Sequence, residues 1–231
     1  MISKSNWIKI SLKIIPIALS IGFLYNCKTS KKNPEQNDTT EWLIADILKT
    51  KSNSIHSNGL PKIVESPYGE AVQFNGIDDA LFIKEMPLKS LKEFTIEMIF
   101  NPSLNAPFEQ RVVHIGKVSD DRMLLEIRAI DNNWYFDGFV ASGENKLALI
   151  DENLLHPLGA WYHVALVVSK NSLSTYVNGK LELTEPYTFN PIETGQSSVG
   201  VRLNKRSWFK GDIYKVKISP KQLKPKEFMS F

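Results

Sequence analysis

The chain has 231 residues, 42% of them hydrophobic and 23% charged, which is the composition of a globular protein and not of a disordered one. Its formal net charge of +3 comes from the first 40 residues, because removing their six Lys and two acids leaves 22 basic and 23 acidic residues. A nearly neutral folded part argues against nucleic acid as a partner.

Residues 1–26 have the pattern of a secretory signal peptide. Lys4, Lys9 and Lys13 precede an apolar run from Ile14 to Tyr25. This run is too short to span a bilayer comfortably, since a membrane-spanning helix needs about 20 apolar residues.

The apolar run ends in Leu24-Tyr25-Asn26-Cys27, which resembles a bacterial lipobox although Tyr25 and Asn26 are larger than the usual residues. An ordinary signal peptide with an incidental cysteine is the alternative. We expect lipidation at Cys27 and a protein anchored in the membrane of the bacterial cell envelope, periplasmic or surface-exposed. Cys27 is the single cysteine, so an intrachain disulfide and a cysteine-based zinc site are excluded. Residues 27–40 should form a flexible linker, because residues 28–40 have no apolar side chain larger than proline.

Residues 41–231 are predicted to form one all-β domain. The pattern of residues 41–51 fits either a helix or an edge strand, and residues 52–61 are rich in loop-forming residues. Strands are then expected at residues 71–74, 80–83, 94–100, 111–115, 123–129, 134–141, 147–150, 161–168, 173–177, 198–203 and 213–218. Such a series of about ten to thirteen short strands, without a long amphipathic helix, is typical of a two-sheet antiparallel sandwich.

The stretch from Trp161 to Gly179 predicts two strands and two turns. Alternation places Tyr162, Val164 and Leu166 toward the core and His163 on the opposite face. Asn178-Gly179 can adopt the positive φ angles of a tight hairpin turn. We assign Trp161 and Trp42 to the core.

Several stretches, in the family's order, resemble laminin G-like jelly rolls of the concanavalin A-like lectin/glucanase superfamily over roughly residues 60–228. They are Ala71–Asp79, Phe94–Glu97, Trp161–Ala165, Tyr176–Gly179 and Trp208–Ile213. The resemblance implies a two-sheet jelly roll whose usual role is to bind a glycan or a protein. Tyr214 and Lys215 stand where the family's last strand usually carries acids, which argues against calcium binding by that strand.

Alternation also predicts polar side chains on the strand faces opposite the core. Such a face is either solvated, with cross-strand ion pairs, or a groove for a saccharide. Arg binds carboxylate or sulfate bidentately and Trp can stack on a pyranose ring, so the groove would suit an acidic or neutral sugar. The candidate ligand-binding residues are Arg111, His114, Glu126, Arg128, Trp134, His163, Arg202, Asn204 and Trp208.

An enzyme that degrades a polysaccharide, either a glycoside hydrolase or a lyase, is the alternative to a non-catalytic module. The chain has no Glu-X-Asp-X-X-Glu run like that of retaining hydrolases in the superfamily. A lyase needs a base and a group that neutralises a uronate, and the available residues are His163, His114, Arg128, Glu126 and Tyr176. We expect a non-catalytic module whose partner is a glycan or a surface protein.

No cofactor is expected, apart from a candidate structural Ca²⁺ at Asp78 and Asp79, which follow Gly76 in a loop. The alternative, which we favour, is that these two carboxylates accept hydrogen bonds from amides of the turn.

Overall fold

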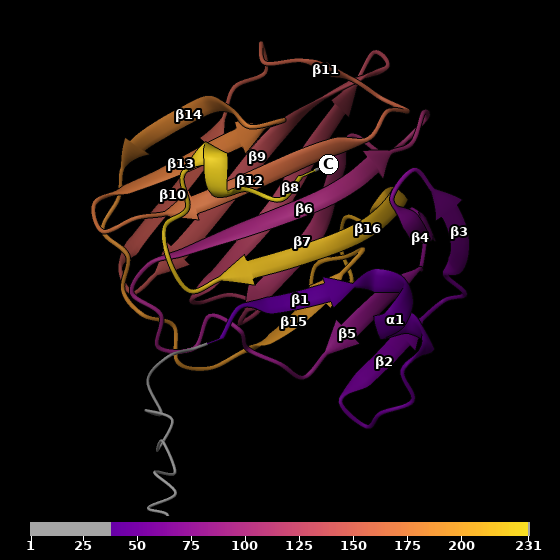
Figure 1. Ribbon diagram of the computed structural model, residues 1–231, viewed down its shortest axis with the longest axis horizontal. Coiled ribbons are helices and arrows are strands. Elements are labelled where there is room, and N and C mark those ends of the chain that lie inside the picture. Colours follow the sequence, from indigo (N-terminus) through magenta and orange to yellow (C-terminus); the bar gives the residue numbers. More distant parts are fainter. Residues whose placement is uncertain (1–37, 231) are drawn as a thin grey trace, which may run out of the picture. The chain divides into compact units, whose positions relative to one another are not determined.

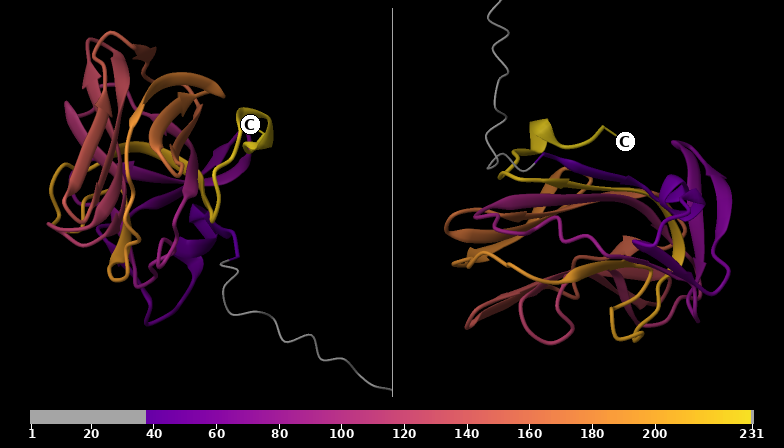
Figure 2. Two further views of the ribbon diagram at one scale, coloured as in Figure 1. Left: turned by 90° about the vertical axis from the view of Figure 1, so that its left-hand side faces the viewer. Right: turned by 90° about the horizontal axis from the view of Figure 1, so that it is seen from below.

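The computed structural model describes residues 38–230, so that Cys27, the predicted signal peptide and most of the predicted linker lie outside the described residues. The described residues form two antiparallel sheets stacked as layers (Figures 1 and 2). The predicted all-β sandwich is therefore confirmed.

One layer, which we call the β6 sheet, contains β1 (Thr40–Leu43), β3 (Lys62–Ser66), β4 (Gly69–Asn75), β6 (Phe94–Pro102), β12 (Tyr162–Val168), β13 (Ser172–Val177), β14 (Lys180–Pro186) and β16 (Lys210–Ser219). Its order is β14-β13-β12-β6-β16-β4-β3, and β1 pairs with the C-terminal half of β16. Strands far apart in the sequence, such as β6 and β16, are therefore direct neighbours.

The other layer, the β8 sheet, contains β2 (Ile55–Asn58), β5 (Ala80–Ile83), β7 (Glu109–Gly116), β8 (Arg122–Ile130), β9 (Asn133–Ser142), β10 (Asn145–Ile150), β11 (His156–Pro157) and β15 (Gln196–Val199). Its order is β10-β9-β8-β7-β15-β5-β2, and β11 pairs with β9. The side chains of β7, β8 and β9 that point away from the β6 sheet form the candidate site described below.

One hydrophobic core fills the space between the two sheets. Phe94, Ile96, Met98 and Phe100 of β6 are completely buried in it, as their alternation predicts. Each such side chain stabilises the fold by about 1.5–3 kcal/mol relative to an exposed one. The β8 sheet contributes its alternate residues, among them Met123, Leu125 and Ile127 of β8.

A glycine sets the close approach of the two sheets at one point. A Cβ at Gly138 of β9 would lie 2.7 Å from Thr175 and 2.8 Å from Leu166, both of the β6 sheet. Because real Cβ atoms do not come so close to other atoms, any larger residue at this position would push the sheets apart.

The predicted central hairpin forms as expected. Tyr162, Val164 and Leu166 of β12 face the core. Asn178 and Gly179 have φ values of 50° and 74° and connect β13 to β14 in a two-residue turn.

The N-terminal part of the domain combines the two alternatives that its pattern left open, because β1 is followed directly by α1 (Ile44–Lys49). Thr40, expected at the end of the linker, is instead the first residue of β1 and pairs with Ile218. Trp42 lies in the core, as expected. None of the helices in the described part of the chain is long and apolar enough to cross a membrane.

Two sequence expectations were wrong about strands. Residues 55–58, expected as a loop, form β2 and pair with β5, since backbone pairing does not require an apolar pattern at a sheet edge. The strand expected at residues 198–203 ends at Val199, because Gly200 has a φ of 87° and the chain leaves the sheet there.

Candidate functional site

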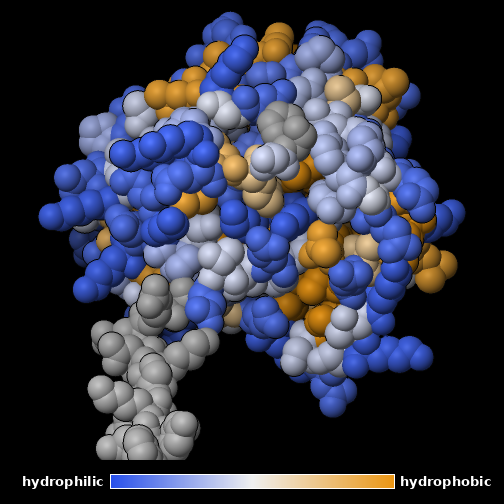
Figure 3. Space-filling view, in the orientation of Figure 1, coloured by the Kyte–Doolittle hydropathy of each residue, from blue (hydrophilic) through white to orange (hydrophobic). Residues whose placement is uncertain are grey.

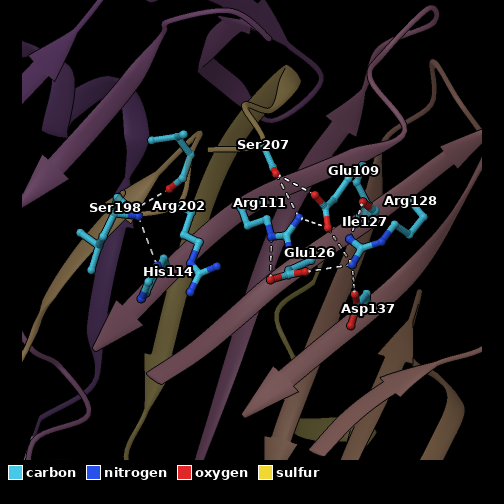
Figure 4. A network of polar contacts seen from close by, with 12 residues as sticks. Glu109, Arg111, His114, Glu126, Ile127, Arg128, Asp137, Ser198, Arg202 and Ser207 are labelled. Atoms are coloured by element: carbon cyan, nitrogen blue, oxygen red, sulfur yellow. Dashed lines mark hydrogen bonds and ion pairs between the residues drawn. The ribbon is translucent and has the colours of Figure 1, made fainter. Parts of the chain in front are cut away.

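Five charged side chains gather on the outer face of the β8 sheet, on the strands β7, β8 and β9 (Figure 4). They are Glu109 and Arg111 of β7, Glu126 and Arg128 of β8, and Asp137 of β9. Their register places Arg111 opposite Glu126 and Glu126 opposite Asp137. We call these five residues the charge network.

The network is closed by direct ion pairs. Arg128 Nη2 lies 2.5 Å from Asp137 Oδ2 and 3.2 Å from Glu126 Oε2, while Arg111 Nε lies 2.9 Å from Glu126 Oε1. Glu109 contacts both arginines and accepts a hydrogen bond of 2.9 Å from Ser207 Oγ. The side chains are therefore held in a fixed array, and little conformational entropy remains to be lost when a ligand binds to them.

The network is buried, which sets its protonation. Glu126 and Asp137 are only 3% and 4% exposed. Burial, together with the neighbouring Asp137 carboxylate, raises the pKa of Glu126 to about 7. Burial also raises the pKa of Asp137, although Arg128 opposes this. The more exposed Glu109 behaves differently, since hydrogen bonds from Arg111 and Ser207 outweigh burial and lower its pKa.

His114 lies on the same outer face but is completely buried. Its Nδ1 accepts a hydrogen bond of 3.2 Å from the Leu203 amide, so its Nε2 carries the proton and donates to the Lys117 carbonyl at 2.9 Å. Burial, with smaller contributions from Arg202 and Arg122, lowers the pKa of His114 to about 4. This imidazole joins two loops and is covered by them.

Two further residues of this face, Arg122 and Phe139, are not among those predicted from the sequence. Arg122 is the first residue of β8 and has the same parity as Glu126 and Arg128, but the predicted strand began one residue later. Its guanidinium lies 4.7 Å from the ring centroid of the half-buried Phe139. Phe139 lies two residues after Asp137 in β9, so strand alternation places its side chain on the same face. This stacked pair adds apolar surface beside the charge network.

Arg202, a predicted site residue, borders the same face. It lies beside His114 (Figure 4) and donates a hydrogen bond of 2.7 Å from Nη2 to the Val118 carbonyl. Asn204 is exposed in the segment that follows β15, and Trp208 is half-buried just before β16. Neither residue belongs to a strand. The prediction that Asn204 shares a strand face with Arg202 is therefore wrong.

The prediction that Trp134 lines a ligand-binding groove is wrong. It is completely buried in the core, where it packs against Phe100 and Tyr162 of the opposite sheet, with ring centroids 5.2 and 5.0 Å away. Its indole therefore has no free face for a sugar ring. The alternation of Trp134 with Phe136 and Val140, both in the core, is the sequence signal that identifies its direction.

His163 also requires a correction, because it lies on the outer face of the β6 sheet and not with the charge network. Its Nε2 is 3.1 Å from Glu97 Oε1, and both side chains are buried. The ring of Phe228, in the C-terminal segment, covers His163 at 5.6 Å, and the Met229 amide donates to Glu97. The suggested catalytic set of His163, His114, Arg128 and Glu126 is thus divided between two opposite faces.

Figure 3 shows the outer face of the β6 sheet, which is mostly hydrophilic. Trp161, expected in the core, is half-buried on this sheet and packs edge-on against Tyr68 with ring centroids 5.7 Å apart. Tyr68 also contacts Tyr214, the residue at the β-bulge of β16. These aromatic residues provide a comparison surface for binding experiments.

The candidate calcium ligands take part in a turn. Asp79 accepts hydrogen bonds from the amides of Leu60 (2.7 Å) and Asn75 (3.1 Å), and Asp78 accepts one from the Asn75 side chain at 2.7 Å. These bonds occupy both oxygens of the Asp79 carboxylate and one oxygen of the Asp78 carboxylate. Among residues 38–230 no group of three or more His, Cys, Asp or Glu side chains could hold a metal ion.

A shallow hollow adjoins the charge network at the sheet edge. It is lined by Tyr135, Ile150, Asp151, Glu152, Asn153 and Leu183. Ile150 pairs with Asp137 and Tyr135 with Arg128, but Leu183 belongs to β14 of the β6 sheet, so the hollow lies at the edge where the two sheets meet.

Residues 75–228 match the model of the Laminin_G_3 family, described as the concanavalin A-like lectin/glucanases superfamily, and the chain belongs to this family. The matched region contains the whole charge network, Arg122, Phe139 and Arg202. No curated protein matches the chain.

Solved structures share the fold. Domain 4 of AbnA, a GH43 extracellular arabinanase from Geobacillus stearothermophilus solved with arabinotriose, has a TM-score of 0.59 at 19% identity, covering 75% of this chain and 84% of that one. The CBM40 domain of the Ruminococcus gnavus IT-sialidase, bound to alpha2,3 sialyllactose, has a TM-score of 0.52 at 17% identity, covering 73% and 95%. The binding domain of botulinum neurotoxin DC, in complex with SialylT, has a TM-score of 0.52 at 11% identity, covering 75% and 44%.

Proposed function

We propose that this protein is a non-catalytic saccharide-binding module of the bacterial cell envelope, and that the saccharide binds on the outer face of the β8 sheet. The observation that carries the proposal is the charge network, a set of donors and acceptors held rigidly by one another beside the half-buried Phe139 ring. Saccharide sites combine such fixed polar groups with an apolar ring surface. The saccharides bound to the three structural neighbours support the proposal.

The binding test uses the full-length chain in detergent on a glycan array, with two variants that report on the two sheets. Phe139→Ala removes the aromatic ring from the proposed face. Tyr68→Ala removes an aromatic ring from the outer face of the β6 sheet and serves as the matched control. We expect Phe139→Ala to weaken saccharide binding at least tenfold and Tyr68→Ala to leave it within twofold. Binding that is lost only with Tyr68→Ala, or no binding to any saccharide, would overturn the proposal.

Catalysis is the second candidate function, and the cross-strand pair of Glu126 and Asp137 is the observation that favours it. A carboxyl group with a pKa near 7 beside a second carboxyl group has the properties of a general acid and its partner. Both groups, however, are buried and ion-paired to Arg128, which leaves them engaged with the protein. We therefore expect neither new reducing ends nor unsaturated products from any polysaccharide that the array identifies. Turnover that Glu126→Gln abolishes in a folded protein would establish the enzyme.

Membrane anchoring through Cys27 is the other part of the proposal, with the bilayer as partner and the envelope as location. It rests on the lipobox-like sequence, since Cys27 lies outside the described residues. Cys27→Ser should prevent lipidation and release the protein from the acylated fraction, and globomycin, which blocks cleavage of lipidated precursors, should make the uncleaved precursor accumulate. Unchanged processing and fractionation under both treatments would contradict lipid anchoring.

A further inference from the structure

Two arginines on the proposed binding face form no direct ion pair with a carboxylate among the described residues, although the Glu126 and Asp120 carboxylates are near enough to oppose the lowering of the Arg122 pKa. Arg122 Nη1 donates to the carbonyls of Ser119 and Asp120 at 2.8 and 2.7 Å, and Arg202 Nη2 donates to the Val118 carbonyl at 2.7 Å. Both guanidinium groups are thus fixed to the backbone of the same loop, residues 117–121. Carbonyl oxygens orient these cations but carry no charge that could neutralise them.

Three other cations on or beside this face, Arg111, Arg128 and Lys117, are different, because each contacts a carboxylate. Arg111 and Arg128 are paired with the three acids of the charge network, and Lys117 lies 3.9 Å from Asp120. Of these five cations, Arg122 and Arg202 are therefore the two that contact no carboxylate directly. The two groups are near enough that, after burial, Arg202 is the next cause that lowers the pKa of Arg122. Like charges this close destabilise each other, and a bound anion would remove the repulsion.

Both arginines also have unused donors. The Nε atoms of Arg122 and Arg202 are buried and form no hydrogen bond, but both side chains are partly exposed, so a ligand would reach the terminal guanidinium nitrogens and not Nε. A guanidinium with unused donors can bind an oxyanion through parallel N–H···O bonds. The Phe139 ring under Arg122 and the 39% exposed Val118 supply apolar surface next to these donors.

We propose that Arg122 and Arg202 form a subsite for the anionic group, carboxylate or sulfate, of an acidic saccharide. The proposal rests on the saccharide-binding function proposed above and adds the class of ligand. It assigns charge recognition to these two arginines and not to Arg111 and Arg128, whose charge the protein itself neutralises. A purely structural role of the pair, anchoring residues 117–121, would affect stability but not the preference between charged and neutral saccharides.

The test compares matched ligands by isothermal titration. One pair is an oligogalacturonide and its carboxyl-reduced form, and the other is a sulfated oligosaccharide and its desulfated form, so that the two possible anions are tested separately. The full-length wild-type chain is compared with Arg202→Gln, Arg202→Lys and Arg122→Gln. Lys117→Gln is the matched control, because it removes one positive charge from the same loop. Thermal unfolding checks that each variant is folded.

The wild-type chain should bind one of the two anionic oligosaccharides at least tenfold more tightly than its neutral form. Arg202→Gln and Arg122→Gln should each reduce this preference to less than twofold, Arg202→Lys should restore part of it, and Lys117→Gln should retain it. Equal binding of charged and neutral forms by the wild-type chain would overturn the anionic subsite and leave saccharide binding intact. Loss of binding to both forms in Arg202→Gln would assign the arginine a structural role instead. Failure to bind any saccharide would overturn both proposals.

Discussion

Arg128 of β8 and Asp137 of β9 are joined across adjacent strands, with Nη2 2.5 Å from Oδ2. The same Nη2 atom contacts Glu126 and Glu109, so that one guanidinium contacts three carboxylates. Arg128 therefore lies at the centre of the outer face of the β8 sheet, on the side away from the hydrophobic core. These ion pairs determine both the stability of this face and which of its polar groups can contact a ligand.

Replacing Arg128 by Ala should therefore destabilise the domain strongly. The change leaves the buried Glu126 and Asp137 without their shared cation, and breaking such a buried pair costs about 3–5 kcal/mol. Urea unfolding of the full-length chain measures the difference. Lys117→Ala, which breaks the exposed contact with Asp120, should cost less than about 1 kcal/mol. Equal effects of the two changes would show that the network contributes no more than a surface pair.

Glu126 should make stability fall as the pH rises. Its pKa is about 7 in the folded state and 4.5 ordinarily, so between these values the folded state binds more protons than the unfolded state. The stabilisation is complete below about pH 4.5 and is lost as the pH approaches 7. Glu126→Gln removes this loss, so the difference in unfolding free energy, variant minus wild type, should become more favourable to the variant between pH 4.5 and 7. A difference that stays constant over this range would show that Glu126 has an ordinary pKa.

His114 should act in the opposite direction. Its folded-state pKa of about 4 lies below the ordinary 6.5, so its contribution is present above about pH 6.5 and is lost as the pH falls through 4. Protonation of Nδ1 removes the acceptor of the Leu203 amide, and we expect the segment after β15 to loosen with it. The NMR titration of the His114 ring protons should give a midpoint near 4, while the exposed His56 serves as the control. A midpoint near 6.5 for His114 would contradict its burial between the two loops.

The C-terminal segment should contribute to stability through Phe228, which packs on His163 and Tyr176 with ring centroids 5.6 and 5.1 Å away. Because the ring is half-buried, Phe228→Ala should cost about 1–3 kcal/mol, less than a fully buried Phe. It should also speed hydrogen exchange at the Met229 amide, which donates to Glu97. Lys226→Ala, an exposed change in the same segment, is the control and should stay within about 0.5 kcal/mol. Similar unfolding curves for both variants would show that the segment is not bound tightly.

Strand alternation predicted the parts of this structure that depend on one strand at a time. The directions of Glu126 and Arg128, and those of Phe94 to Phe100, follow from a period of two residues and a buried face. The same rule, applied to Trp134, would have placed this residue in the core beside Phe136. Had the predicted strand of β8 begun one residue earlier, the rule would also have placed Arg122 on the outer face.

Other features depend on strand order, which alternation does not contain. His163 and Glu126 both lie on outward faces, but the pairing of β12 with β6 places His163 on the opposite side of the sandwich. Its burial depends on Phe228, in a segment with no periodic pattern. The contact between Arg202 and Val118 likewise joins two loops 84 residues apart.

We propose that the saccharide binds on the outer face of β8 and β9. Hydrogen–deuterium exchange of the full-length chain, with and without the tightest oligosaccharide from the array, tests it most directly. The ligand should slow exchange in residues 109–142 and leave residues 162–177 of the β6 sheet unchanged. Slower exchange confined to residues 162–177 would contradict the claim.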